Sequence, residues 1–196
     1  MNAIATRLSH TRTLVAVMAA AALFAATAAH AAPINYVTSL SGPNESPPNA
    51  SPGTGSATLV VDTATHLWTL HVDFTGLLGT TSASHTHAPT AVAGAGTAGV
   101  ATTTPTYAGF PLGVTSGTYD NVFDMTLATS YNPSYVTANG GTTASAEAAL
   151  AAAIAAGKAY LNIHTSVVSG GEIRGFWTAA VPVQNTSWGR IRNLYH

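Results

Sequence analysis

Apolar and polar side chains alternate along several short stretches of this chain. The clearest stretch is residues 66–74, where apolar side chains occupy every second position, at Trp68, Leu70, Val72 and Phe74. Because successive residues of a β-strand point to opposite faces, this pattern predicts a strand with one buried face. Residues 55–62 alternate in the same way, and the Asp-Thr-Ala-Thr sequence that follows predicts a turn. The two stretches together predict a β-hairpin.

Three further strands are expected nearer the C-terminus, at residues 119–127, 159–164 and 173–181. Short alternating stretches separated by turn residues are typical of an all-β sandwich or barrel. Residues 88–106 are rich in Ala, Gly and Thr and offer few side chains for packing, so they predict a long loop or a weak edge strand. We therefore expect a mainly β fold.

One segment has helical character. Residues 145–156 consist mostly of alanine, Leu150 and Ile154 lie one helical turn apart, and Gly157 is placed to end a helix. Ser145 is a suitable N-cap. The apolar stripe is narrow, so we expect one short α-helix lying over an edge or an open end of the sheets.

Residues 1–31 have the pattern of a secretory signal peptide. Arg7 and Arg12 precede an apolar run at residues 13–27, and a small-x-small sequence ends at Ala31. The run is shorter than the roughly 20 apolar residues that span a bilayer. We expect cleavage after Ala31, a secreted or periplasmic protein, and no membrane span after cleavage.

The rest of the chain is expected to form one domain at residues 32–182, followed by a C-terminal tail at residues 183–196. The tail shows no alternation and is expected to be flexible. The whole chain has six Lys or Arg, seven Asp or Glu and a formal net charge of −1, so it has no basic field to hold a nucleic acid. It has no cysteine, which excludes disulfides and a thiolate nucleophile and fits a Gram-negative periplasm.

The sequence shows no catalytic constellation. Its acidic residues are scattered, without an obvious acid–base pair, and it contains neither a Gly-x-Ser-x-Gly elbow nor a P-loop. We therefore favour a non-enzymatic role.

Three histidines are the residues most suited to bind a metal. His85 and His87 are two positions apart and would project from the same face of a strand. His164 joins them if the fold brings its strand alongside. Three imidazoles from two strands can bind Cu(II) or Zn(II).

The alternative interpretation is a structural polar network that fixes the register of the strands. In that case the three histidines are buried with Glu172 and Arg174, and a carboxylate–guanidinium pair with histidine donors satisfies its members internally. Glu172 and Arg174 are equally well interpreted as an ordinary exposed ion pair. The sequence alone leaves these interpretations open.

Three stretches of the chain, in order, resemble the CHRD domain, which was first described in chordin and is widespread in secreted bacterial proteins. The stretches are Leu40-Ser-Gly-Pro-Asn-Glu45-Ser-Pro47-Pro48 with Gly55-Ser-Ala-Thr-Leu, then Ala83-Ser-His85-Thr-His87-Ala-Pro89, then Tyr160-Leu-Asn-Ile-His164-Thr165 with Gly170-Gly171-Glu172-Ile-Arg174-Gly175. The resemblance covers roughly residues 36–181. It implies an antiparallel Greek-key β-sandwich of the immunoglobulin or superoxide dismutase type.

Two functions follow as hypotheses. The first is a secreted, non-enzymatic CHRD-type module that binds an unknown protein or surface partner or serves a structural role. The alternative is a periplasmic copper- or zinc-binding protein that uses His85, His87 and His164.

Overall fold

The apolar stripes predicted from the sequence are buried on one side of a single antiparallel sheet in the computed structural model, which describes residues 32–181. The strands are β1 (Ile34–Ser41), β2 (Thr54–Asp62), β3 (Leu67–Thr75), β4 (Thr81–His87), β5 (Gly117–Asp124), β6 (Tyr160–Thr165), β7 (Ile173–Phe176) and β8 (Thr178–Ala179). The predicted signal peptide and C-terminal tail lie outside the described residues.

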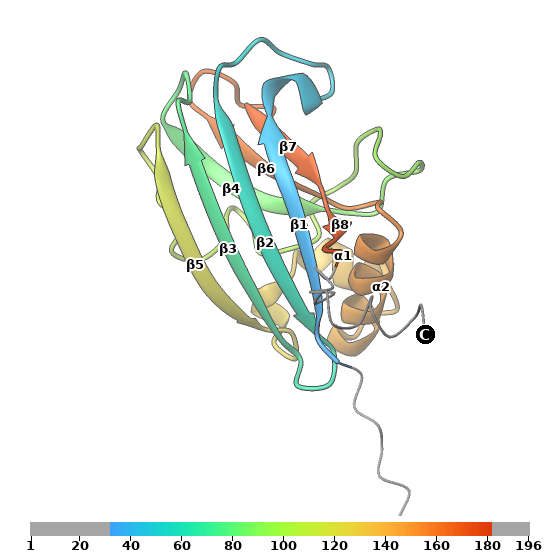
Figure 1. The fold of residues 1–196 in the computed structure, drawn as a ribbon. Coiled ribbons are helices and arrows are strands. Elements are labelled where there is room, and N and C mark those ends of the chain that lie inside the picture. The colour runs from blue at the N-terminus through green and yellow to red at the C-terminus, as the bar shows by residue number, and fades with distance from the viewer. Residues whose placement is uncertain (1–31, 182–196) are drawn as a thin grey trace, which may run out of the picture.

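The sheet curls strongly. Its strand order is β4-β6-β7-β1-β2-β3-β5, with β8 paired to β1 beside β7. Figure 1 shows the long strands β1, β2, β3 and β5 on one side and β4 and β6 passing behind them. The mainly β, antiparallel part of the prediction is confirmed. The two-sheet Greek-key sandwich is not shown, because hydrogen bonds connect all the described strands into one curled sheet.

The predicted hairpin is confirmed. β2 pairs with β3 without interruption from Thr54 opposite Thr75 to Asp62 opposite Leu67. One carboxylate oxygen of Asp62 accepts hydrogen bonds from the N–H groups of Ala64 (2.9 Å) and Thr65 (3.1 Å), which closes the turn.

Two α-helices cover the open end of the curled sheet (Figure 1). They are α1 (Pro133–Ala138) and α2 (Thr143–Ala155), and the short 3-10 turns are η1 (Gly42–Asn44) and η2 (Ala128–Ser130). The sequence analysis missed α1, which has only six residues and begins with an Asn132 cap before Pro133. None of the helices in residues 32–181 is long and apolar enough to cross a membrane.

The predicted helix exists, but its predicted N-cap was wrong. The N-cap is Thr142, whose side chain accepts the Ser145 N–H while the Ser145 side chain accepts the Thr142 N–H. Ser145 is therefore the third residue of a reciprocal capping box. The predicted C-terminal end is confirmed, since Gly157 follows α2 with a positive φ of 66°.

The last predicted strand divides at Trp177. β7 pairs with β6 and β1, whereas β8 pairs with β1. Trp177 is fully buried, but Ala179 and Val181, which the alternation placed on the same face, are exposed. The alternation fails there because the strand pairing changes after Trp177.

The carboxylate of Glu172 joins four separate parts of the chain. The Glu172 side chain is fully buried. It accepts hydrogen bonds from the hydroxyls of Ser51 and Thr165, both at 2.6 Å. It also accepts from the N–H groups of Leu78 (2.6 Å) and Gly79 (3.1 Å). Burial raises the pKa of Glu172, but these hydrogen bonds together outweigh burial and hold it below its usual value.

We predict that Glu172→Gln destabilises the protein. The glutamine amide replaces one carboxylate oxygen with an NH2 group, which is a donor and cannot accept from the hydroxyl and backbone N–H groups around it. The free energy of unfolding should therefore fall by roughly 2 to 3 kcal/mol. Urea denaturation at pH 7 measures this change. The matched control is Asp120→Asn on the exposed surface. Equal losses in the two variants would contradict the prediction.

Candidate metal centre

The pairing of β4 with β6 brings the three predicted histidines together. His85 lies opposite Asn162, His87 lies opposite Tyr160, and His164 lies opposite Ala83. Directly opposed residues project from the same side of a sheet. The histidines, Tyr160 and Asn162 therefore share a face of the sheet. On β7, Phe176 lies opposite Tyr160 and Arg174 lies opposite Asn162, so these two residues belong to the same face.

We call this side of β4, β6 and β7 the histidine face. Its members are His85, His87, Tyr160, Asn162, His164, Arg174 and Phe176. The alternate residues of the same strands, such as Leu161 and Ile163, point into the core and are fully buried. Although the histidine face lies on the other side of the strands from the core, most of it is also shielded from solvent.

Each histidine of the cluster uses one ring nitrogen to bind a backbone carbonyl. His85 Nε2 lies 2.6 Å from the Pro105 oxygen, His87 Nδ1 lies 2.9 Å from the Ala98 oxygen, and His164 Nδ1 lies 2.8 Å from the Ser169 oxygen. A carbonyl oxygen only accepts hydrogen bonds, so the ring nitrogen facing it carries the proton. In a neutral imidazole the other nitrogen then presents a lone pair.

Three ring nitrogens of the cluster present lone pairs without a partner. They are His85 Nδ1, His87 Nε2 and His164 Nε2, and each is buried without a hydrogen-bond partner. One nitrogen from each ring lies within 4.8 Å of those of the other two. Metal-binding histidines commonly donate their second ring N–H to a carbonyl, which fixes the tautomer and the orientation of the ring. The arrangement on the histidine face has this form.

The surroundings keep the cluster uncharged. Burial lowers the pKa of His85, His87 and His164. The effect is largest at His87, whose pKa falls to about 4 through burial, with further lowering by the neighbouring histidines and Arg174. At neutral pH the rings are therefore in the form that binds metal ions.

The loop after β4 supplies two of the three carbonyls. Residues 88–106 form no named strand, only isolated bridges such as His87 with Val100. This confirms the prediction of a loop. Its contribution to the site comes from the backbone oxygens of Ala98 and Pro105. Sequence analysis missed this role because a backbone carbonyl leaves no signature in the sequence.

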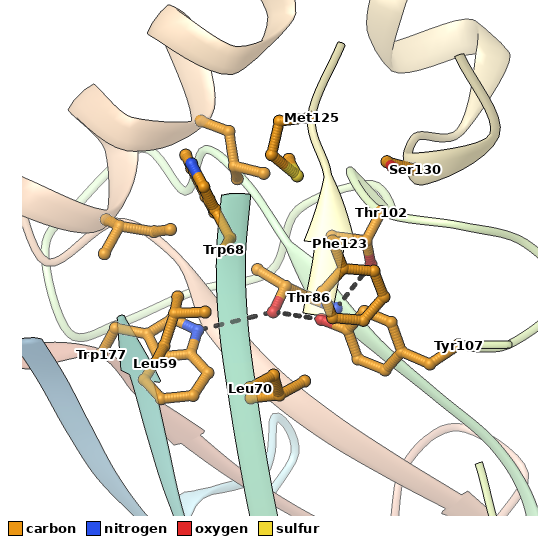
Figure 2. A pocket seen from close by; sticks show the side chains of 12 residues that line it. Leu59, Trp68, Leu70, Thr86, Thr102, Tyr107, Phe123, Met125, Ser130 and Trp177 are labelled. Carbon is orange, nitrogen blue, oxygen red and sulfur yellow. Dashed lines mark hydrogen bonds between the residues drawn. The ribbon is translucent and has the colours of Figure 1, made fainter. Parts of the chain in front are cut away.

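The core side of β4 holds the histidine strand in place. Thr86, between the two histidines, points inward, where its hydroxyl accepts hydrogen bonds from Tyr107 Oη (2.7 Å) and Trp177 Nε1 (3.4 Å). Figure 2 shows these contacts beside a largely apolar cavity. The cavity has a volume of about 20 Å³, enough for about one water molecule. It is therefore a packing gap and not the functional site.

Glu172 and Arg174 lie in separate clusters. Glu172 binds the loop groups described above, whereas Arg174 has Glu45 as its carboxylate partner, with 3.7 Å between Nε and Oε2. Both members of the Arg174–Glu45 pair are buried. Burial raises the pKa of Glu45 to about 7, and the Arg174 charge opposes part of this rise. Glu45 has no role that could be predicted from the sequence, since 129 residues separate it from Arg174.

Tyr160 connects the arginine to the histidine cluster. Its ring stacks on His87, with centroids 4.8 Å apart and planes 3° apart. The guanidinium carbon of Arg174 lies 4.7 Å from the centroid of the same tyrosine ring. Because β6 lies between β4 and β7, Tyr160 lies between the cation and His87 in the strand order.

The other two histidines of the described residues lie away from the cluster, His66 in the turn before β3 and His71 on β3, and both have carboxylate partners. His66 Nδ1 is 2.6 Å from Glu147, and exposed His71 contacts Asp120 (2.7 Å) and Asp73 (2.9 Å). His71 therefore serves as a control position.

The comparison with known families identifies the domain. The sequence profile of the CHRD domain matches residues 36–177, a span that contains every strand pair of the histidine face. The chain belongs to the CHRD domain family. The predicted resemblance is thereby confirmed. No curated protein and no solved structure matches the chain.

We predict that His87 destabilises the metal-free CHRD domain as the pH falls from about 6.5 to about 4, measured as the difference between the wild type and a His87→Gln variant. The unfolded chain binds protons on its histidines with a pKa near 6.5, whereas folded His87 resists protonation down to about 4. In this pH range His87 therefore binds a proton in the unfolded chain but not in the folded protein, which should cost about 3 kcal/mol by pH 4. The raised pKa of Glu45 acts in the opposite direction in both proteins, so the contribution of His87 is obtained from the comparison with its variant. Urea unfolding in EDTA at a series of pH values measures the change in stability of each protein. Acidification should cost His87→Gln about 3 kcal/mol less than the wild type, and an equal pH dependence in the two proteins would contradict the assignment.

Proposed function

We propose that this CHRD-domain protein is an exported module that binds one copper or zinc ion through His85, His87 and His164. Two observations carry the proposal: one ring nitrogen of each histidine is buried without a hydrogen-bond partner, and each ring offers a nitrogen within 4.8 Å of those of the other two. Imidazole is a good ligand for both metals, and three such ligands from two paired strands form a preorganised site.

A purely structural role explains the geometry less well. A buried acceptor left without a donor costs roughly 1 to 3 kcal/mol, and the cluster holds three such acceptors. A single water molecule has two O–H groups, so it cannot donate to all three nitrogens. Protonating a ring would supply a donor, but burial opposes this protonation. A metal ion accepts all three lone pairs at once.

Export forms part of the proposal. The charged and apolar pattern of residues 1–31 supports a signal peptide and hence a periplasmic or secreted location. We propose a binding role without assigned catalysis, since the sequence offers no acid–base pair or activated nucleophile. We include in this proposal that the exported module also binds an unknown protein or surface partner.

The first test is elemental analysis of protein purified from the periplasm without a histidine tag. We predict close to one equivalent of copper or zinc per chain in the wild type. The double variant His85→Ala/His87→Ala should lose the metal, since one remaining imidazole cannot hold it. The control His71→Ala removes a histidine that lies outside the cluster and should retain the metal. Circular dichroism checks that each variant is folded.

Thermal melts give a second measurement on the same proteins. A ligand at 100 times its dissociation constant stabilises the native state by about 2.7 kcal/mol, a rise in Tm of roughly 5 to 10 °C for a domain of this size. The wild type and His71→Ala should show this rise on metal addition. Metal binding by the folded double variant with wild-type affinity would overturn the proposal, as would the absence of any metal-dependent rise in the wild type.

A further inference from the structure

We infer that the histidine cluster is selective for a univalent ion, Cu(I), over divalent zinc or copper. This inference rests on the proposed function and names the ion that the site takes. It follows from the charges around the three nitrogens.

The cluster offers ligands without negative charge. His85, His87 and His164 each present a neutral nitrogen, so the charge of a bound ion remains on the complex. The other unpartnered acceptor on the histidine face, Asn162 Oδ1, is also uncharged. The cost of burying an ion rises with the square of its charge, and buried ions usually require an opposite charge nearby. A divalent ion therefore loses more than a univalent ion in this site.

The nearest charged groups do not compensate a divalent ion. Arg174 lies on the far side of the Tyr160 ring, with its guanidinium carbon 4.7 Å from the centroid of the ring that stacks on His87. A cation in this position repels a metal ion bound by the histidines, and it repels a divalent ion twice as strongly as a univalent ion. Glu45, the carboxylate on this side, is paired with Arg174 and also accepts hydrogen bonds from the Asn162 amide.

The other buried carboxylate near β6 does not face the cluster. The oxygens of Glu172 are directed to Ser51, Thr165 and the N–H groups of Leu78 and Gly79. Four hydrogen bonds occupy this anion, so it gives the histidines no direct partner.

The number of ligands favours the same ion. Zn(II) in proteins is almost always four-coordinate, and a site with three histidines completes its shell with water or another ligand. Here the three ligand nitrogens have almost no contact with solvent. Cu(I) is stable with three ligands or fewer, so the cluster can satisfy it without admitting water.

The test compares Cu(I), Ag(I), Cu(II) and Zn(II) on the metal-free protein under anaerobic conditions, each titrated against a competing chelator of known affinity. Ag(I) serves as a univalent ion that does not change oxidation state in the assay. We expect Cu(I) and Ag(I) to bind one equivalent, and Zn(II) to bind at least on the order of tenfold more weakly than Cu(I). His85→Ala/His87→Ala should lose the binding of the univalent ions.

Two charge variants test the cause. Arg174→Met removes the cation and should shift the ratio of Zn(II) to Cu(I) affinity toward zinc by on the order of tenfold, whereas Arg174→Lys keeps the charge and should leave the ratio close to that of the wild type. Glu45→Gln removes the opposing anion and should shift the ratio toward Cu(I). The measurement is made at pH 8, where Glu45 is ionised. Since Glu45→Gln retains an acceptor for Asn162, it tests the inference even if Arg174→Met fails to fold.

The outcomes separate the two proposals. If none of the ions binds, the proposed function itself fails. If Zn(II) or Cu(II) binds as tightly as Cu(I), the metal site stands and the univalent selectivity is overturned. An affinity ratio that is the same in wild type, Arg174→Met and Glu45→Gln would also overturn it, because the charges would then have no effect on the choice of ion.

Discussion

Most polar groups on the histidine face are subject to one constraint: they have been removed from water and need a partner inside the protein. The backbone of the loop at residues 88–106 meets much of this need, through the Ala98 and Pro105 oxygens on two histidines and the Gly96 oxygen on Arg174. These bonds fix which ring nitrogen of His85 and of His87 carries the proton, and the Ser169 oxygen does the same for His164. The other ring nitrogen of each histidine has no hydrogen-bond partner, and these are the nitrogens that could bind a metal ion.

The two buried carboxylates have different tasks under the same constraint. Glu172 accepts hydrogen bonds from groups that are far apart in the sequence and holds the loops near Ser51 and Leu78 to the end of β6. Glu45 is paired with Arg174 and sets the charge near the cluster. One carboxylate thus connects distant loops, and the other balances the charge of Arg174 beside the histidine face.

Much of this arrangement could be predicted from the sequence. The alternation of apolar and polar residues predicted the hairpin of β2 and β3, and the two-residue spacing of His85 and His87 predicted that they share a face. Both predictions depend only on the local geometry of a strand. The contacts that depend on distant pairing could not be read in this way. Nothing local indicates that Arg174 pairs with Glu45 and not with Glu172, or that Tyr160 stacks on His87. The carbonyls that orient the histidines carry no side-chain signal at all.

The loop that covers the histidine face also occupies the free edge of β4. β4 ends the sheet, and an open edge of this kind readily accepts a strand from another molecule. Here the N–H groups of Ala101, in the loop, and of Tyr107, directly after it, donate to the Thr86 and Ser84 oxygens, which would otherwise be available to that strand. The segment that orients His85 and His87 therefore also protects the protein from edge-to-edge aggregation. Shortening this loop would expose the hydrogen-bonding edge of β4 to other strands and would also remove the carbonyls that orient His85 and His87.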